Sequence, residues 1–163
     1  MPSSVIDLSL QVASATVTDT GVEECVQRLA LRQLNLSQAT ALTDASVRHI
    51  VTHSNTLQTL SLSYNRWLSQ NALMDLTRME SLRELQLAAI NAIDDDIIRS
   101  ILRKCTNLRQ LNISHNAVSS AAFSELWLCV PTLRSLDVQY CANISAEDVL
   151  AVQLMCPHLR IVS

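Results

Sequence analysis

Apolar and polar residues alternate in short segments that recur at a nearly constant interval along the chain. The pattern L-x-x-L-x-L, with some conservative replacements, begins at residues 5, 31, 57, 82, 108 and 133, and a partial seventh copy begins at residue 159. Successive copies are 25 or 26 residues apart. Because alternation of this kind is typical of a half-buried strand, each copy predicts one strand whose leucines face the interior.

A turn and a second segment follow each predicted strand. The second segment has apolar residues at helical spacing, among them Val47, Ile50, Leu73, Leu76, Val149, Val152 and Leu154. It is preceded by Thr18, Thr43, Ser69, Asp94, Ser119 and Ser145, one in each copy. Side chains of these types accept hydrogen bonds from the free N–H groups at the start of a helix, so they are predicted N-caps. Each unit therefore predicts a strand, a turn and a helix of two to three turns.

Repeated units of this size predict a stacked, quasi-one-dimensional architecture. A single unit cannot bury its own leucines, but neighbouring units can enclose them between each other. Each buried Leu, Ile or Val contributes about 1.5–3 kcal/mol of transfer free energy. We therefore expect residues 1–163 to form a single α/β domain in which parallel strands make one sheet and the helices cover one of its faces.

The repeat resembles the leucine-rich repeat, and in particular its ribonuclease-inhibitor-like and cysteine-containing subclass, as in the repeat domains of F-box proteins. The subclass has Cys three residues before the strand, and Asn or Cys after it. The matching residues are Cys105 and Cys156 before the strand, with Cys129 displaced by one position, and Asn65, Asn116 and Cys141 after it. The resemblance implies a horseshoe-shaped solenoid with parallel strands on the concave side, helices on the convex side, and a non-catalytic role in protein binding.

The composition of the chain limits which classes of binding partner and which cellular compartment we expect. The net charge is −3, with 12 basic and 15 acidic residues, which argues against a nucleic-acid partner. No run of 18 apolar residues predicts a membrane span. The five cysteines form no CxxC pair, and the first residues do not resemble a signal peptide. We therefore expect reduced thiols and a cytoplasmic or otherwise intracellular protein.

Residue patterns associated with catalysis or cofactors are weak. Gly21 is the sole glycine, which excludes a glycine-rich phosphate loop. His49 and His53 are four residues apart on a predicted helix, but no Glu stands between them as in zinc proteases. No Ser, Cys or His has neighbours in the sequence that suggest an activated nucleophile. We expect neither enzymatic activity, nor a cofactor, nor a metal ion.

One outward position in the predicted strands is repeatedly arginine. The series is Arg83, Arg109, Arg134 and Arg160. Because neighbouring strands lie about 4.8 Å apart, these side chains predict a basic stripe along one rim of the concave face. Such a stripe could bind an acidic protein partner, although Glu84 and Asp137 lie nearby and would partly neutralise it. The alternative is that the arginines only cover apolar surface with their stems.

The remaining concave positions are polar or aromatic. Gln86 and Asn112 in the middle of the sheet could form directional hydrogen bonds with a protein partner. At the far rim we expect Tyr64, His115 and Tyr140, with Ala88 and Ala89 forming a notch between Tyr64 and His115. Exposed tyrosine is favoured at binding hot spots, so this notch is a candidate for a partner side chain. The alternative is a set of ordinary exposed rim residues.

The two ends of the stack lack obvious polar caps in the sequence. Three explanations are open: the chain is a piece of a larger repeat protein, a partner or self-association covers at least one end, or a bare end is tolerated. Two functional variants therefore stay open beside partner binding on the concave face. One is a structural subunit of a larger assembly, and the other is the substrate-receptor part of an F-box-type ubiquitin ligase.

Overall fold

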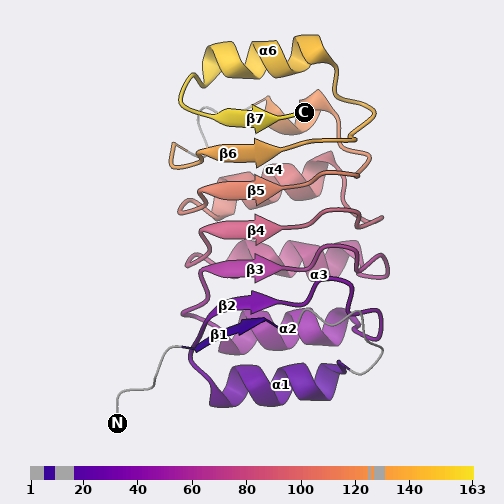
Figure 1. The fold of residues 1–163 in the computed structure, drawn as a ribbon, viewed down its shortest axis with the longest axis vertical. Coiled ribbons are helices and arrows are strands. Elements are labelled where there is room, and N and C mark those ends of the chain that lie inside the picture. Colours follow the sequence, from indigo (N-terminus) through magenta and orange to yellow (C-terminus); the bar gives the residue numbers. More distant parts are fainter. Residues whose placement is uncertain (1–5, 10–16, 125, 127–130) are drawn as a thin grey trace.

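The computed structural model describes residues 6–9, 17–124, 126 and 131–163. Within these ranges, seven parallel strands form one sheet in the order of the sequence (Figure 1). They are β1 (Ile6–Ser9), β2 (Leu31–Asn35), β3 (Thr59–Ser61), β4 (Glu84–Gln86), β5 (Gln110–Asn112), β6 (Ser135–Asp137) and β7 (Arg160–Val162). Each unit therefore contributes one strand, which pairs with the strand of the preceding unit.

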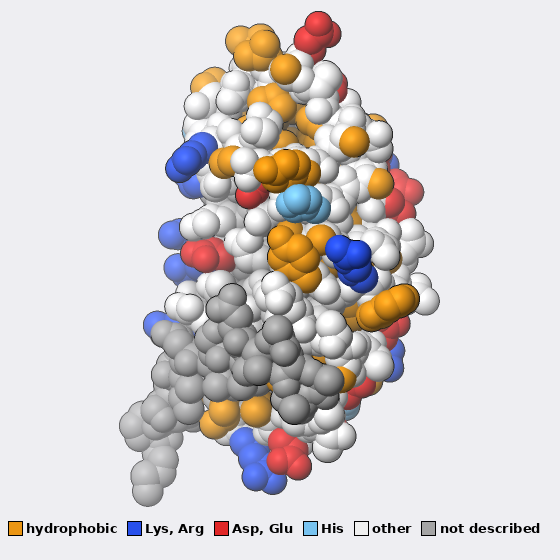
Figure 2. Space-filling view, turned by 45° about the vertical axis from the view of Figure 1, so that its right-hand side comes forward, with side chains coloured by type: hydrophobic (Ala, Val, Ile, Leu, Met, Phe, Trp, Pro, Cys, Tyr) orange, Lys and Arg blue, Asp and Glu red, His pale blue; other side chains and the backbone are white. Residues whose placement is uncertain are grey.

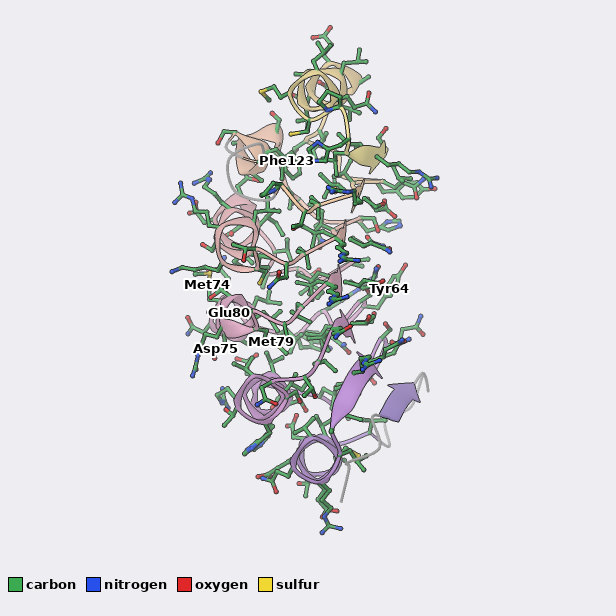
Figure 3. The ribbon with its side chains drawn as sticks, turned by 90° about the vertical axis from the view of Figure 1, so that its left-hand side faces the viewer. Tyr64, Met74, Asp75, Met79, Glu80 and Phe123 are labelled. Atoms are coloured by element: carbon green, nitrogen blue, oxygen red, sulfur yellow. The ribbon has the colours of Figure 1, made fainter. Side chains whose placement is uncertain are left out.

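Helices cover one face of this sheet. They are α1 (Asp19–Arg28), α2 (Asp44–His53), α3 (Gln70–Asp75), α4 (Asp95–Lys104) and α6 (Ala146–Met155), with 3₁₀ helices η1 (Leu76–Arg78) and η2 (Ser120–Phe123). In Figure 3, Met74 and Glu80 lie on the helix side, whereas Tyr64 lies on the side of the strands. The prediction of an α/β leucine-rich-repeat solenoid is thus confirmed. None of the described helices is long and apolar enough to cross a membrane.

The six predicted N-caps are all confirmed. Each side chain accepts a hydrogen bond from a backbone N–H in the first turn that follows. At the last helix, Ser145 and Asp148 form a reciprocal capping box. Local side-chain chemistry therefore determines where each helix begins.

The core is a set of leucine rows that run along the stack. Strand register places Leu34, Leu60, Leu85, Leu111 and Leu136 opposite one another, and none of these is more than 2% exposed. The first leucines of the pattern form a second buried row beside them. The leucines of each unit are thus buried between neighbouring units, as the repeat predicts.

The two 25-residue steps correspond to units with altered helices. The unit that begins at Leu57 has the six-residue α3 followed by η1, and the described part of the unit that begins at Leu108 contains η2. A 3₁₀ helix rises about 2.0 Å per residue, against about 1.5 Å in an α-helix. A shorter segment can therefore cover the same width of the helix layer.

The expected helical spacing of Val149, Val152 and Leu154 in the last helix is wrong for Leu154. Val152 in α6 is buried, but Leu154 is 81% exposed, and Leu150 and Met155 are also exposed. Residues two positions apart in a helix point about 200° apart, so Leu154 cannot share the buried face of Val152. Apolar residues thus lie on both sides of α6, and only one side packs against the described stack.

Candidate functional site: the open face of the sheet

The face of the sheet that the described helices leave uncovered is the candidate binding surface, and we call it the open face. Side chains on it alternate with the buried leucines and are exposed or partly exposed. Arginines lie where the strands begin, amides lie in the middle, and aromatic residues lie where the strands end. These three zones contain all eight binding residues that the sequence predicts.

The predicted arginine stripe exists as a continuous column of neighbours. The backbone N–H of Arg109 donates to the carbonyl of Arg83 over 2.7 Å, and the N–H of Arg134 donates to Arg109 over 2.8 Å. The N–H of Arg160 in turn donates to Arg134 over 2.9 Å. All four side chains are exposed. We call Arg83, Arg109, Arg134 and Arg160 the arginine column.

Most of this column has no partner within the described part of the protein. Arg134 donates to the backbone carbonyls of Pro131 and Leu133, at 2.9 and 3.2 Å. The guanidinium groups of Arg83, Arg109 and Arg160 form no ion pair or hydrogen bond with any described residue. These cations are therefore available to a ligand.

The two carboxylates expected to neutralise the column bond elsewhere. Glu84 accepts a hydrogen bond from the side-chain amide of Gln110 at 3.3 Å. Asp137 accepts from the backbone N–H of Gln139 at 3.0 Å. Among the described residues, neither carboxylate forms an ion pair with an arginine of the column.

The central amides differ in how free they are. Asn112 accepts hydrogen bonds from the N–H and hydroxyl of Ser114, at 2.9 and 2.8 Å. Its oxygen thus stabilises the turn after β5, a role that the sequence analysis did not predict. Gln86 lies directly opposite Asn112 on β4 and is partly exposed, and its side chain has no hydrogen-bond partner among the described residues. Gln86 is therefore the more available of the two for a partner.

The residues at the end of each strand share an unusual backbone conformation. The φ angles are positive at Gln38 (62°), Tyr64 (65°), Ala89 (54°), His115 (59°) and Tyr140 (59°). The left-handed region costs a non-glycine residue about 1–2 kcal/mol. Bonds between units offset this cost, for example from Tyr64 N–H to the carbonyl of Ala88 at 2.8 Å. We call these five residues the left-handed row.

Buried polar side chains form hydrogen bonds with the backbone of the turns that contain the left-handed row. The Asn116 amide nitrogen donates to the carbonyls of Leu87 and Ile113, at 2.8 and 2.9 Å, and its oxygen accepts from Ile90 N–H at 2.9 Å. Asn65 donates in the same way to two carbonyls, and the Cys141 thiol donates to one. These side chains satisfy the backbone at each turn and so hold the row in place.

Two rings of the left-handed row stack on each other. The centroids of His115 and Tyr140 are 4.3 Å apart and their planes differ by 15°. On the other side of Ala89, Tyr64 is 41% exposed. Ala88 and Ala89 are almost completely buried, at 4% and 9% exposure. The structure therefore places two small residues between Tyr64 and the stacked pair.

Trp67 is a surface residue that the sequence analysis missed. It follows Tyr64 by three residues and is 79% exposed. The corresponding positions of two other units are Ala41 and Ala92, so the replacement of a small residue by Trp was the available signal. Figure 2 shows hydrophobic side chains gathered beside a histidine on this side of the molecule.

Candidate chemistry elsewhere is limited. His49 lies 3.6 Å from the carboxylate of Glu23, while His53 is exposed at the end of α2. Among the described residues, no group of three or more His, Cys, Asp or Glu is placed to hold a metal ion. Burial, together with the charge of Glu80, raises the pKa of the Cys105 thiol to about 11, so this thiol is unreactive near neutral pH.

Comparison with known families agrees with the repeat architecture. The family model described as "Leucine Rich repeat" matches residues 53–76, 104–122 and 131–152. Over 67 residues, the chain is 37% identical to F-box/LRR-repeat protein 5 of Mus musculus, and equally to that of Bos taurus. This match covers 40% of the chain but only 10% of the relative.

Solved structures show the same fold at low sequence identity. A chain in the crystal structure of the Rad7 and Elc1 complex in yeast superposes with a TM-score of 0.76 at 20% identity, over 90% of this chain and 39% of that one. A Bacteroides fragilis protein gives a TM-score of 0.61 at 17% identity, over 82% of this chain and 41% of that one. The chain is therefore built of leucine-rich repeats, and the stretch that matches relatives is similar to F-box/LRR-repeat proteins.

Proposed function

We propose that this chain is a non-catalytic protein-interaction module that binds an acidic segment of a partner protein on the open face. The observation that supports this most directly is the arginine column, which has three guanidinium groups without a partner among the described residues. Free cations in register along a sheet match a partner with carboxylates at a similar spacing. Complementary charge of this kind raises association rates and selects partners.

The charge distribution supports the same proposal. The whole chain has a net charge of −3, so a positive column is a local departure from an acidic surface. The side chain of Gln86 and the amide nitrogen of Asn112 add hydrogen-bonding groups next to the column. Tyr64, His115 and Tyr140 add exposed ring surface at the other end of the strands. We infer that all eight residues contact one partner and that residues 1–163 act as one domain.

The free thiols and the relatives together support an intracellular location. The four described cysteines are free thiols, and the relatives are F-box/LRR-repeat proteins. We propose an intracellular module that needs no cofactor. The partner's identity is an experimental question, because the matched stretch covers only a tenth of the relatives' length.

The test is affinity purification with charge-reversal variants. Arg83→Glu with Arg109→Glu reverses two unpartnered cations, and Arg48→Glu on the helix side is the control because it is also exposed. Proteins recovered with the wild type and the control, but lost with the double variant, would be bound through the column. Identical recovery by all three proteins would refute the proposal.

A second candidate function is a structural subunit whose last helix is covered by a neighbour. Leu150, Leu154 and Met155 of α6 are 59%, 81% and 50% exposed, which favours this alternative. An adaptor of F-box proteins among the recovered partners would instead favour a substrate receptor. If Leu154→Glu releases a partner that is otherwise recovered at fixed stoichiometry, the structural role is supported; unchanged recovery would exclude contact through α6.

A further inference from the structure

A shallow hollow lies on the open face over the strands β4–β7 (Figure 1). Its volume is about 170 Å³. The strand register explains its position, because Ser135 on β6 stands between Gln110 on β5 and Arg160 on β7. A small side chain between two long ones leaves room there for a group of a ligand.

The polar groups that line the hollow include one formal charge, the carboxylate of Asp137. One oxygen of this carboxylate accepts the bond from the N–H of Gln139, and the other has no partner among the described residues. The side chains of Ser135 and Gln86 also line the hollow and have no hydrogen bond within the described part of the protein. The hollow therefore offers acceptors to a ligand that has N–H donors.

The neighbouring arginines do not neutralise Asp137. The guanidinium group of Arg134 donates to the carbonyls of Pro131 and Leu133, which holds it before the start of β6. Arg160, on the neighbouring strand, forms no ion pair with Asp137 and does not line the hollow. A carboxylate thus lies on a basic face without a counterion from the described residues, so the hollow favours a cation.

Apolar side chains in the hollow narrow the choice of cation. Leu111 lines the hollow and is only 2% exposed, and Val162, which pairs with Asp137 in register, is partly exposed. The four-carbon stem of a lysine can contact such apolar surface while its ammonium group meets the carboxylate. A guanidinium group binds best to both oxygens of a carboxylate, but one oxygen of Asp137 is already bonded to the backbone. Lysine is therefore the better match.

We propose that the hollow beside Asp137 receives a lysine side chain of the partner whose acidic residues contact the arginine column. This inference rests on the proposed function, because it adds a second contact to the same segment of the partner. Arg134, the column residue of this unit, stands three residues before Asp137, which is about 10 Å of extended chain. In an extended partner segment, the lysine should therefore be about three residues from an acidic residue.

Matched peptides test the inference. One has three glutamates, a Gly-Ser spacer and a lysine, with both ends blocked, and the second has acetyl-lysine in place of the lysine; both are also made in reversed order. Acetylation keeps the stem and removes the charge, so the arginine column alone would favour the acetylated peptide. We expect the lysine peptide to bind the wild-type chain about fivefold more tightly in at least one orientation, the upper range for an ion pair that solvent reaches. Isothermal titration calorimetry gives the constants.

Two variants locate the effect. Asp137→Asn removes the charge but keeps an oxygen that can accept from the N–H of Gln139, so we expect a folded protein. It should lose the preference for the lysine peptide and keep the binding of the acetylated peptide. Glu84→Gln changes the net charge equally at a carboxylate that does not line the hollow, and it should keep the preference. A preference that survives in Asp137→Asn would place the lysine elsewhere and overturn the inference.

Methyl groups of Val162 give a readout that is independent of affinity. In NMR spectra of the wild-type complex, nuclear Overhauser effects should connect them to the methylene groups of the lysine. Equal or weaker binding of the lysine peptide in both orientations, without these contacts, would refute the inference and leave the arginine column intact as a binding site. Absence of binding by every peptide at millimolar concentration would refute both proposals.

Discussion

Two polar columns run along this molecule, and they differ in how far their charges are satisfied. On the helix side, Asp19, Asp44 and Asp95 each begin a helix and each bind the N-cap residue of the next unit. Asp44, for example, accepts hydrogen bonds from the N–H (2.9 Å) and the hydroxyl of Ser69. We call these three residues the carboxylate column. The arginine column on the open face has almost no such bonds.

The contrast separates a structural role from a role in recognition. Each carboxylate is close to the positive end of its own helix and accepts charge-assisted hydrogen bonds from the neighbouring unit. It therefore links two units at a defined spacing. The guanidinium groups link no described units and keep their hydrogen-bonding capacity for a ligand. Removing a carboxylate should thus lower stability, whereas removing an arginine should lower binding.

The largest expected effect concerns the buried amides that satisfy the turns of the left-handed row. Asn116→Ala leaves two carbonyls and one N–H without their side-chain partner inside the protein. We expect the free energy of unfolding to fall by about 3 kcal/mol. The control is Asn143→Ala, because Asn143 is exposed and donates a single bond, to Ala117 at 3.1 Å. Urea unfolding measures both, and equal losses would contradict the supporting role of Asn116.

The comparison of the two columns is tested directly by one residue from each. Asp44→Ala should lower the free energy of unfolding by about 1–2 kcal/mol, because the N–H and the hydroxyl of Ser69 both lose their acceptor. Arg109→Ala should change it by less than about 0.5 kcal/mol. Urea unfolding at one ionic strength provides both values. A loss at Arg109 as large as that at Asp44 would show that the arginine column is also structural.

A smaller effect of opposite sign is expected at Ser54. This residue stands three positions before Leu57, where other units have Cys105 or Cys156, and its buried hydroxyl has no hydrogen-bond partner. Ser54→Cys replaces that hydroxyl by a thiol that tolerates burial, so stability should rise by about 1 kcal/mol. A thermal unfolding scan under reducing conditions measures the change. A lower melting temperature would show that the hydroxyl is bound after all.

The smallest effect is the pH dependence of the carboxylate column. Burial raises the pKa of Asp19, but hydrogen bonds from Ser46 and Thr43 outweigh this and leave the pKa below its ordinary value of 3.8. Since the folded state then binds protons less readily than the unfolded state, the contribution of Asp19 is complete above that value and is lost as the pH falls below it. Asp19→Asn should therefore be less stable than the wild type at pH 7, and the difference should shrink toward pH 3. A constant difference would argue against this assignment.

Much of the fold could be predicted from particular residues, while the state of the binding surface could not. The N-caps depend on local bonds within three residues, so their chemistry is visible in the sequence. Positive φ angles at residues other than glycine are not visible, because the partners that stabilise Tyr64 and His115 come from the next unit. The bond between Asn112 and Ser114 spans only two residues, so its chemistry was visible in the sequence although the sequence analysis did not predict it.

The sequence by itself determined the repeat length, the direction of the leucines and the starts of the helices, because these follow from periodicity and short-range hydrogen bonds. Only the tertiary structure decided which charges are free. Glu84 follows Arg83 in the sequence, yet it accepts a hydrogen bond from Gln110 of the neighbouring strand. The left-handed row likewise exists only in the stack, because the N–H groups of Gln38, Tyr64, Ala89 and His115 donate to carbonyls of the next unit.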